Sequence, residues 1–173
     1  MVNSRQFSAL ISTIAILSQG CSGVAGPGFV AGAPPIFSVS FPADVQLSAH
    51  VDPLDAPPTS WQPAVRFTNT GKDVATVEHG ACSVAVWIYP ATAQSAAPVW
   101  DNRLPPNTAC IAIGYMRRVA PGESYDLLAG VLDRSRLGGL PEGDYKVVLA
   151  VRPSLRQDAP LTVLPAGQIT LRF

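Results

Sequence analysis

The sequence has 173 residues, a formal net charge of zero and a hydrophobic fraction of 47%. Nucleic-acid-binding domains usually carry a basic stripe and a high isoelectric point. This chain has an isoelectric point of about 6.7, and its longest basic run is the pair Arg117-Arg118. The composition therefore argues against a nucleic acid as the partner.

The chain begins with a pattern typical of an export signal. Arg5 precedes an eleven-residue, mostly apolar segment from Phe7 to Leu17, and small residues follow it up to Cys21. A bilayer-spanning helix needs about 20 apolar residues, so this segment is too short to span. An apolar segment of about 7–15 residues behind a positively charged start is the pattern of a signal peptide. We therefore predict that residues 1–20 are a signal peptide.

Cys21 lies where a lipoprotein leader places the acylated first residue of the mature protein. The leucine that usually stands three residues before such a cysteine is one place too early, at Leu17, and Ser18 takes its position. Ordinary signal peptidase cleavage before Cys21 or after Ala25 is the alternative, and it would give a freely secreted protein. A cytosolic chain with an apolar end is a third. We expect a lipid anchor at Cys21 and a location in the cell envelope, on its periplasmic or extracellular face.

Residues 21–43 are rich in Gly, Ala, Pro and Ser. Gly-rich and Pro-rich stretches form flexible or extended spacers and do not build cores. This segment is predicted to be a tether, although the apolar residues toward its end, Ile36, Phe37 and Phe41, also allow it to dock as an early strand.

Residues 44–173 carry the pattern of short strands separated by Pro and Gly turns. The apolar residues from Val45 to Val51 alternate with mostly polar neighbours, which is the period of a half-buried strand. The segment 83–89 is the strongest candidate, because it is rich in β-branched and aromatic residues. The other predicted strands are 63–69, 74–78, 98–100, 110–115, 123–131, 144–152 and 168–173, and 133–140 is predicted to hold a helical turn.

Short strands at intervals of about 8–15 residues predict an all-β sandwich or barrel, of which we favour an antiparallel β-sandwich. Tyr145 opens a late strand directly after the Pro141-Glu142 turn. In immunoglobulin-like domains a tyrosine at such a corner hydrogen-bonds to the backbone a few residues upstream. Tyr145 is predicted to do the same, with a purely structural role.

Cys82 and Cys110 belong to a chain that the leader directs to an oxidising compartment, where two cysteines predict a disulfide bond. The rival interpretation is a metal site built from these cysteines with His79 and His50. Zinc sites usually show C-x-x-C or paired-His spacing. His79 lies only three residues before Cys82, but the chain has neither spacing, so the disulfide is favoured and no metal or other cofactor is expected. Pairing of Cys82 with Cys110 leaves Cys21 as the odd thiol, which acylation accounts for.

Four short motifs together resemble the BsuPI-like domains, a family named after an intracellular proteinase inhibitor of Bacillus. They are 65–71 (VRFTNTG), 98–101 (PVWD), 120–124 (APGES) and 140–145 (LPEGDY). The resemblance covers about residues 62–173 and implies an immunoglobulin-like sandwich. It implies proteinase inhibition by association only, since the family offers no reactive residue that maps onto this chain.

No catalytic constellation is present in the sequence. Nucleophilic catalysis needs Ser or Cys beside a His base, and the chain has two histidines and no Gly-x-Ser-x-Gly motif. We therefore predict that it is not an enzyme and that it acts as a protein-interaction module. Aromatic residues and Arg dominate binding hot spots, so the candidate binding surface is the set Trp61, Trp100, Asp101, Arg103, Arg117 and Arg118.

Two alternatives stay open for the partner. A protease inhibitor would present the loop 101–108 (DNRLPPNT), with Arg103, to a protease cleft. A structural subunit of an envelope complex is the other. The expected partner is thus an unidentified protein, and the membrane is contacted through the lipid anchor alone.

Overall fold

The computed structural model describes residues 39–80, 82–92, 97–104, 114–153 and 160–172. The predicted signal peptide, Cys21, Cys110 and all of the predicted tether before Val39 lie outside these ranges. Ten strands and one short helix are present in the described part of the chain.

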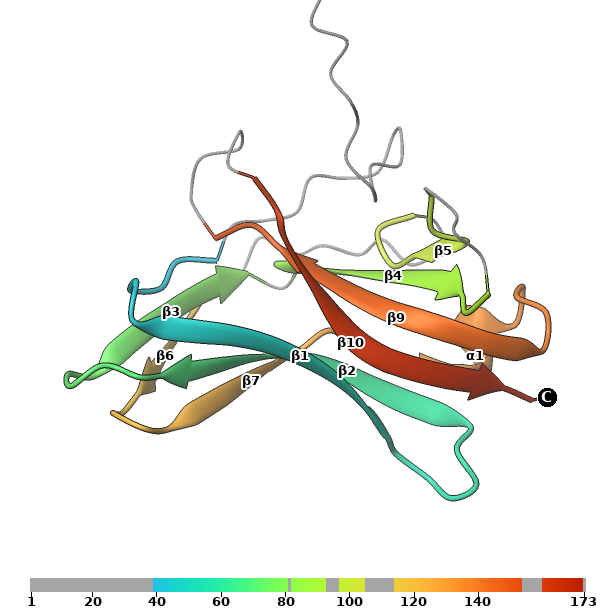
Figure 1. Cartoon of the computed structure of the whole chain (residues 1–173), viewed down its shortest axis with the longest axis horizontal. Helices are drawn as coiled ribbons and strands as arrows, with labels where there is room; N and C mark the ends of the chain where they lie inside the picture. Colours follow the sequence, from blue (N-terminus) through green and yellow to red (C-terminus); the bar gives the residue numbers. More distant parts are fainter. Residues whose placement is uncertain (1–38, 81, 93–96, 105–113, 154–159, 173) are drawn as a thin grey trace, which may run out of the picture.

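Two antiparallel sheets form a β-sandwich, which confirms the predicted fold class (Figure 1). The first sheet has the order β1-β2-β7, and β8 also pairs with β2. Its strands are β1 (Val45–Pro53), β2 (Ser60–Asn69), β7 (Ser124–Leu128) and β8 (Leu132–Asp133). The second sheet has the order β10-β9-β4-β5. Its strands are β4 (Val84–Pro90), β5 (Trp100–Asp101), β9 (Gly143–Val151) and β10 (Thr162–Leu171).

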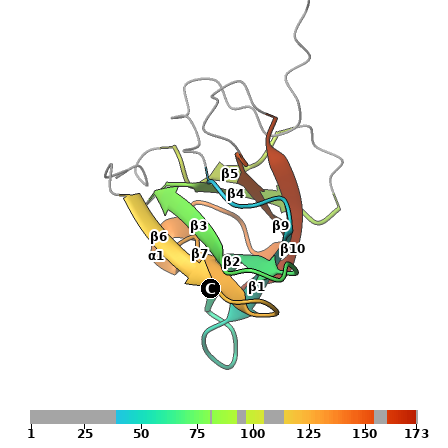
Figure 2. The same ribbon diagram turned by 90° about the vertical axis from the view of Figure 1, so that its left-hand side faces the viewer.

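These pairings correspond to the A-B-E and C′-C-F-G sheets of immunoglobulin-like domains. The hydroxyl of Tyr145, at the start of β9, donates to the carbonyl of Pro141 at 2.8 Å, so the predicted tyrosine corner is confirmed. A third, two-stranded sheet joins β3 (Ala75–Gly80) to β6 (Gly114–Val119). This ribbon stands at one end of the sandwich, on the left in Figure 1 and toward the viewer in Figure 2.

The core lies between the two sheets and follows the strand period. Val84, Val86 and Ile88 on β4 face it, whereas Ala85 and Trp87 form a smaller apolar cluster with Ala150 on the opposite face. β4 is therefore buried on both faces, which is why its sequence is almost continuously apolar. Burying an aliphatic side chain of this kind stabilises a fold by about 1.5–3 kcal/mol.

The end of the predicted tether, from Val39 onward, is packed against the sandwich. Val39 is fully buried, Ser40 pairs with Glu78 as an isolated bridge, and the ring of Phe41 meets that of Phe67 at 5.5 Å. The apolar residues at the end of this segment thus add to the sandwich, because they cover core residues that β1 leaves open.

Several strand boundaries differ from the predicted ones. β6 runs from Gly114 to Val119, past the predicted end at Tyr115, because its pairing with β3 continues as far as Ala75. β10 starts at Thr162 and not at Gln168, and a register shift between Pro165 and Gly167 interrupts its apolar pattern. The predicted helical turn is α1 (Arg134–Leu137), with Asp133 as its N-cap.

Candidate functional site

The six residues of the predicted binding surface do not form one contiguous surface. They occupy three regions of the sandwich: Trp61 on β2, Trp100, Asp101 and Arg103 on and just after β5, and Arg117 and Arg118 on β6. The β5 corner is closed, Trp61 is 5% exposed and borders a cavity, and Arg117 and Arg118 are exposed.

The β5 corner is internal. Asp101 is 2% exposed, and its carboxylate accepts from the indole Nε1 of Trp87 at 3.1 Å. It also accepts from the backbone N, Nε and Nη2 of Arg103, at 2.9, 3.0 and 2.6 Å. The Arg103 guanidinium lies 5.6 Å from the Trp87 ring centroid, and its side chain is only 12% exposed. Asp101 and Arg103 therefore cover the outer-face cluster, and a partner cannot reach their charged groups.

Trp100 is likewise used for packing. It is half-buried against the main core, and its Nε1 donates to the carbonyl of Arg136 at 3.1 Å. This bond fastens β5 to α1. Of the loop proposed for protease inhibition, Arg103 is held against Asp101, and residues 105–108 lie outside the described part of the chain.

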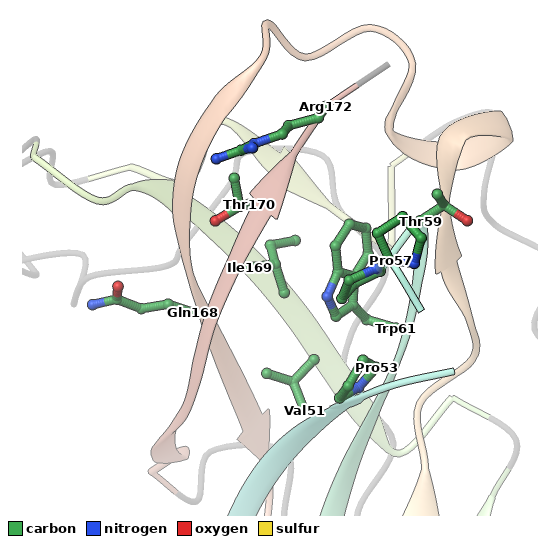
Figure 3. A pocket seen from close by; sticks show the side chains of 10 residues that line it. Val51, Pro53, Pro57, Thr59, Trp61, Gln168, Ile169, Thr170 and Arg172 are labelled. Atoms are coloured by element: carbon green, nitrogen blue, oxygen red, sulfur yellow. The ribbon is translucent and has the colours of Figure 1, made fainter. Parts of the chain in front are cut away.

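Trp61 lines a cavity with a volume of about 600 Å³ at the end of the sandwich opposite the β3–β6 ribbon. Figure 3 shows its indole ring beside Pro57, with Ile169 on β10 and Val51 and Pro53 on β1 around it. The lining residues are mostly apolar: Val51, Pro53, Pro57, Pro58, Thr59, Trp61, Gln168, Ile169, Thr170 and Arg172. Ligand cavities in proteins commonly have volumes of about 300–1,000 Å³ and apolar walls.

The loop between β1 and β2 forms one wall of the cavity, and Asp55 organises it. The Asp55 carboxylate accepts from the backbone N of Thr59 at 2.8 Å and of Ser60 at 3.0 Å, and from the hydroxyls of both residues. These hydrogen bonds, that from the Thr59 hydroxyl first, lower the pKa of Asp55 to about 2. The loop is thereby closed on itself, which sets Pro57 and Pro58 at the rim.

The opposite wall depends on the irregular path of β10. β1 and β10 are the edge strands of their sheets and run alongside each other (Figure 1). Gly167 has a φ of +143°, which side chains other than that of glycine rarely permit, and a Cβ placed there would lie 3.0 Å from Cγ1 of Val51. Glycine at this position therefore lets β10 approach β1 and present Ile169 to the cavity.

The cavity offers hydrogen-bond donors within apolar walls. The indole N–H of Trp61 makes no hydrogen bond within the described part of the chain, and it is not sealed from the cavity. Arg172 is exposed at the rim and has no carboxylate partner among the described residues. The ten lining residues include no carboxylate, histidine or thiol. The site can therefore hold an apolar group that carries a hydrogen-bond acceptor, and its lining supplies no acid–base pair.

A row of charged groups crosses the outer face of the first sheet. Nε and Nη2 of Arg66 donate to the two Asp126 carboxylate oxygens, both at 2.7 Å, and Nε2 of His50 lies 3.6 Å from the same carboxylate and 3.5 Å from that of Asp52. The hydrogen bond from Arg66 holds the pKa of Asp126 below its usual value. This row joins β1, β2 and β7, and it accounts for His50 as a structural strand residue.

His79 is the other histidine, and it belongs to an aromatic stack that the sequence did not indicate. Its ring lies 5.4 Å from that of Tyr115 and 5.8 Å from that of Tyr125, whose hydroxyl is 2.9 Å from its Nε2. Arg117 lies 5.8 Å over the Tyr125 ring. Burial raises the pKa of Tyr125, and Arg117 opposes that shift. These residues come from β3, β6 and β7, so the pairing of β3 with β6 and the position of β7 beside this ribbon together bring them into contact.

The structure also bears on the predicted disulfide, on the rival metal site and on membrane-spanning helices. In the described ranges no three His, Cys, Asp or Glu side chains gather as a metal site would require. Cys82 is half-buried and takes part in a disulfide, while Cys110 lies outside those ranges, so its pairing with Cys82 stays a prediction. No described helix has the length and apolar character needed to cross a bilayer.

No protein-family model matches the chain, and no curated protein is significantly similar to it.

Proposed function

We propose that this protein is a non-catalytic binding module of the cell envelope that holds an apolar side chain of a protein partner in the Trp61 cavity. The single observation that carries this proposal is the apolar cavity of about 600 Å³ between the β1–β2 loop and β10. Apolar cavities with a few convergent polar groups are the default binding sites of protein domains.

The chemistry of the cavity favours a peptide over a purely hydrocarbon ligand. Three proline rings and the Trp61 indole supply rigid apolar surface, which loses little conformational entropy on binding. The free Trp61 N–H and the Arg172 guanidinium supply donors that suit a backbone carbonyl or a carboxylate next to the apolar side chain. A tryptophan and an arginine at one cavity also match the residue types that dominate protein-binding hot spots.

The test fills the cavity without touching the core. Gln168 lines the cavity from an exposed position, so Gln168→Trp is expected to block it at small cost to folding. Thr76→Trp, on the exposed face of β3 at the other end of the molecule, is the matched control. Affinity capture from envelope extracts of the producing cell is expected to recover a partner with the wild type and the control, and not with Gln168→Trp. Recovery of the same proteins with all three would contradict the proposal.

The identity of the captured partner separates the remaining alternatives. A protease would favour the inhibitor function, and components of one assembly would favour a structural subunit. The resemblance to BsuPI-like domains remains part of this proposal. Its support is that the motif residues Asn69 and Gly122 meet in the fold, where the Gly122 N–H donates to the Asn69 carbonyl at 2.8 Å.

Export and lipid anchoring at Cys21 complete the proposal. They rest on the leader pattern of residues 1–20 and on the odd number of cysteines. The intact mass of the mature protein, purified from its host envelope, tests them together. We expect cleavage before Cys21, the added mass of acyl chains, and the loss of two hydrogens for a Cys82–Cys110 disulfide. A mature chain that starts after Ala25 would overturn the anchor.

A further inference from the structure

β6 and β7 leave the same turn but join different sheets. The turn 120–123 is tight, with the Glu123 N–H donating to the Ala120 carbonyl at 3.0 Å and Gly122 at a φ of +77°. Two strands joined in this way usually pair as a hairpin. Here β6 pairs with β3, and β7 pairs with β2, so the two strands diverge from the turn (Figure 1).

Asn69 holds the strands apart at their common end. It is fully buried, and its Nδ2 donates to the carbonyls of Val119 at 2.9 Å and Asp73 at 2.8 Å. Its backbone N–H donates to the Glu123 carbonyl at 3.0 Å. Asn69 thus bonds the last residue of β6 through its side chain and the turn before β7 through its main chain, which fixes the point of divergence.

β7 presents an open edge to the space between the strands. The Asn69 N–H donates to the Glu123 carbonyl, and the Ala129 N–H donates to the Pro63 carbonyl. The backbone N–H and C=O groups of the odd-numbered residues of β7 therefore point toward β2. Because hydrogen bonding alternates along an antiparallel strand, the N–H and C=O groups of Ser124, Asp126 and Leu128 point away from β2. No backbone partner for these groups is present within the described ranges. Such an edge is a template for another strand.

The space beside this edge is a groove with a volume of about 500 Å³. Tyr115, Met116 and Leu128 are 47%, 76% and 59% exposed around it, which is unusual for large apolar side chains. His79 and Tyr125 form part of its lining. The groove lies at the end of the sandwich opposite the Trp61 cavity, so it is a separate site.

The groove is positively charged. Arg117 lines it and is exposed with no carboxylate partner in the described part of the chain, whereas Arg118, the next residue of β6, lies on the opposite face of that strand. Asp126, the one acidic residue of the lining, is already bonded by Arg66 through both oxygens. The charge left for a partner is therefore that of Arg117.

We propose that an extended acidic segment of a protein partner binds in this groove as an added strand along the open edge of β7. Its main chain pairs with the outward groups of Ser124, Asp126 and Leu128, and an acidic side chain meets Arg117. Strand addition supplies affinity through main-chain hydrogen bonds, while the side chains supply selectivity. The proposal does not depend on the occupant of the Trp61 cavity.

The test titrates the full chain with two fluorescein-labelled decapeptides, one alternating Glu with Val and the other Lys with Val. Fluorescence anisotropy is expected to show binding of the Glu-Val peptide and at least about tenfold weaker binding of the Lys-Val peptide. Arg117→Glu is expected to weaken the Glu-Val peptide by about tenfold or more. Lys146→Glu, the same change in charge on the exposed face of β9 in the other sheet, is the control and leaves its affinity within about twofold.

Leu128→Pro tests the main-chain pairing separately. It removes an N–H that points away from β2, so the variant is expected to keep its fold and to lose the peptide. Amide exchange of the wild type should slow at Ser124, Asp126 and Leu128 when the peptide is bound. Equal affinity for both peptides, no binding of the Glu-Val peptide at millimolar concentration, or unchanged exchange at these three amides would overturn the proposal.

Discussion

Arg103 and Arg117 are placed alike and used differently. Each guanidinium lies over an aromatic ring, 5.6 Å from the Trp87 centroid and 5.8 Å from that of Tyr125. Arg103 is 12% exposed and bonded to a buried Asp101, whereas Arg117 is exposed and has no carboxylate partner within the described residues. An arginine beside an aromatic residue thus marks either a closed structural corner or an open surface. The difference is whether a buried carboxylate, such as that of Asp101, also bonds the arginine.

The largest expected effect comes from opening the closed corner. Asp101→Asn removes the charge that compensates Arg103 and is expected to lower the free energy of unfolding by about 3 kcal/mol, because a buried charge is left without its partner. Urea denaturation measures this loss. Arg103→Met in the same background should restore part of it, since the uncompensated charge is then gone. A loss below about 1 kcal/mol for Asp101→Asn would show that the Asp101–Arg103 pair contributes no more than an exposed ion pair does.

The neutral hydrogen bond of Tyr145 provides a reference for the loss in unfolding free energy expected of Asp101→Asn. Tyr145→Phe removes the bond from the tyrosine hydroxyl to the Pro141 carbonyl and leaves the ring in the core. The expected loss is about 1 kcal/mol, the usual net contribution of such a bond. If the same denaturation series gave Tyr145→Phe a larger loss than Asp101→Asn, the distinction between the two kinds of corner would fail.

The open arginine is expected to matter little for stability. Arg117→Ala should change the free energy of unfolding by less than about 0.5 kcal/mol, because exposed side chains without strong partners contribute little. Thermal and urea unfolding of the variant measure this directly. A loss of 1 kcal/mol or more would show that the contact with Tyr125 is structural, and the contrast with Arg103 would be lost.

Asp55 is the exposed counterpart of Asp101, and the stability that its hydrogen bonds contribute is lost only at low pH. Its pKa of about 2 lies below the ordinary 3.8, so its stabilising hydrogen bonds are fully present above about pH 4. They are lost as the pH falls through about 2. Thr59→Val removes the largest cause of the shift, and carboxyl carbon chemical shifts should then show the pKa returning toward 3.8. An unchanged value would assign the shift to the backbone donors.

Much of the fold was predictable from the sequence, because it rests on local signals. Period-two alternation located β1 and β2, the continuous apolar run located β4, and the turn before Tyr145 located the corner at the start of β9. Each of these depends on residues close together in the chain. The pairing of β3 with β6 is different, since it joins segments about 40 residues apart and carries no local mark.

The binding surface was predictable only in part, because residue type does not report burial. Asp101 and Arg103 have the composition of a hot spot, yet they face Trp87 on the outer side of β4. Trp61 does reach a cavity, but its wall on β10 depends on the bulge at Gly167, which no sequence pattern indicated. The stack of His79 with Tyr115 and Tyr125 was missed for the same reason as the β3–β6 pairing.

The irregularity of β10 also affects how copies of this protein meet one another. β10 is the outer strand of its sheet, and an outer strand with a regular hydrogen-bonding edge invites edge-to-edge aggregation. Pro165 brings no N–H to that edge, and the shift in register between Pro165 and Gly167 breaks its repeat. Pairing of two copies through β10 is therefore disfavoured.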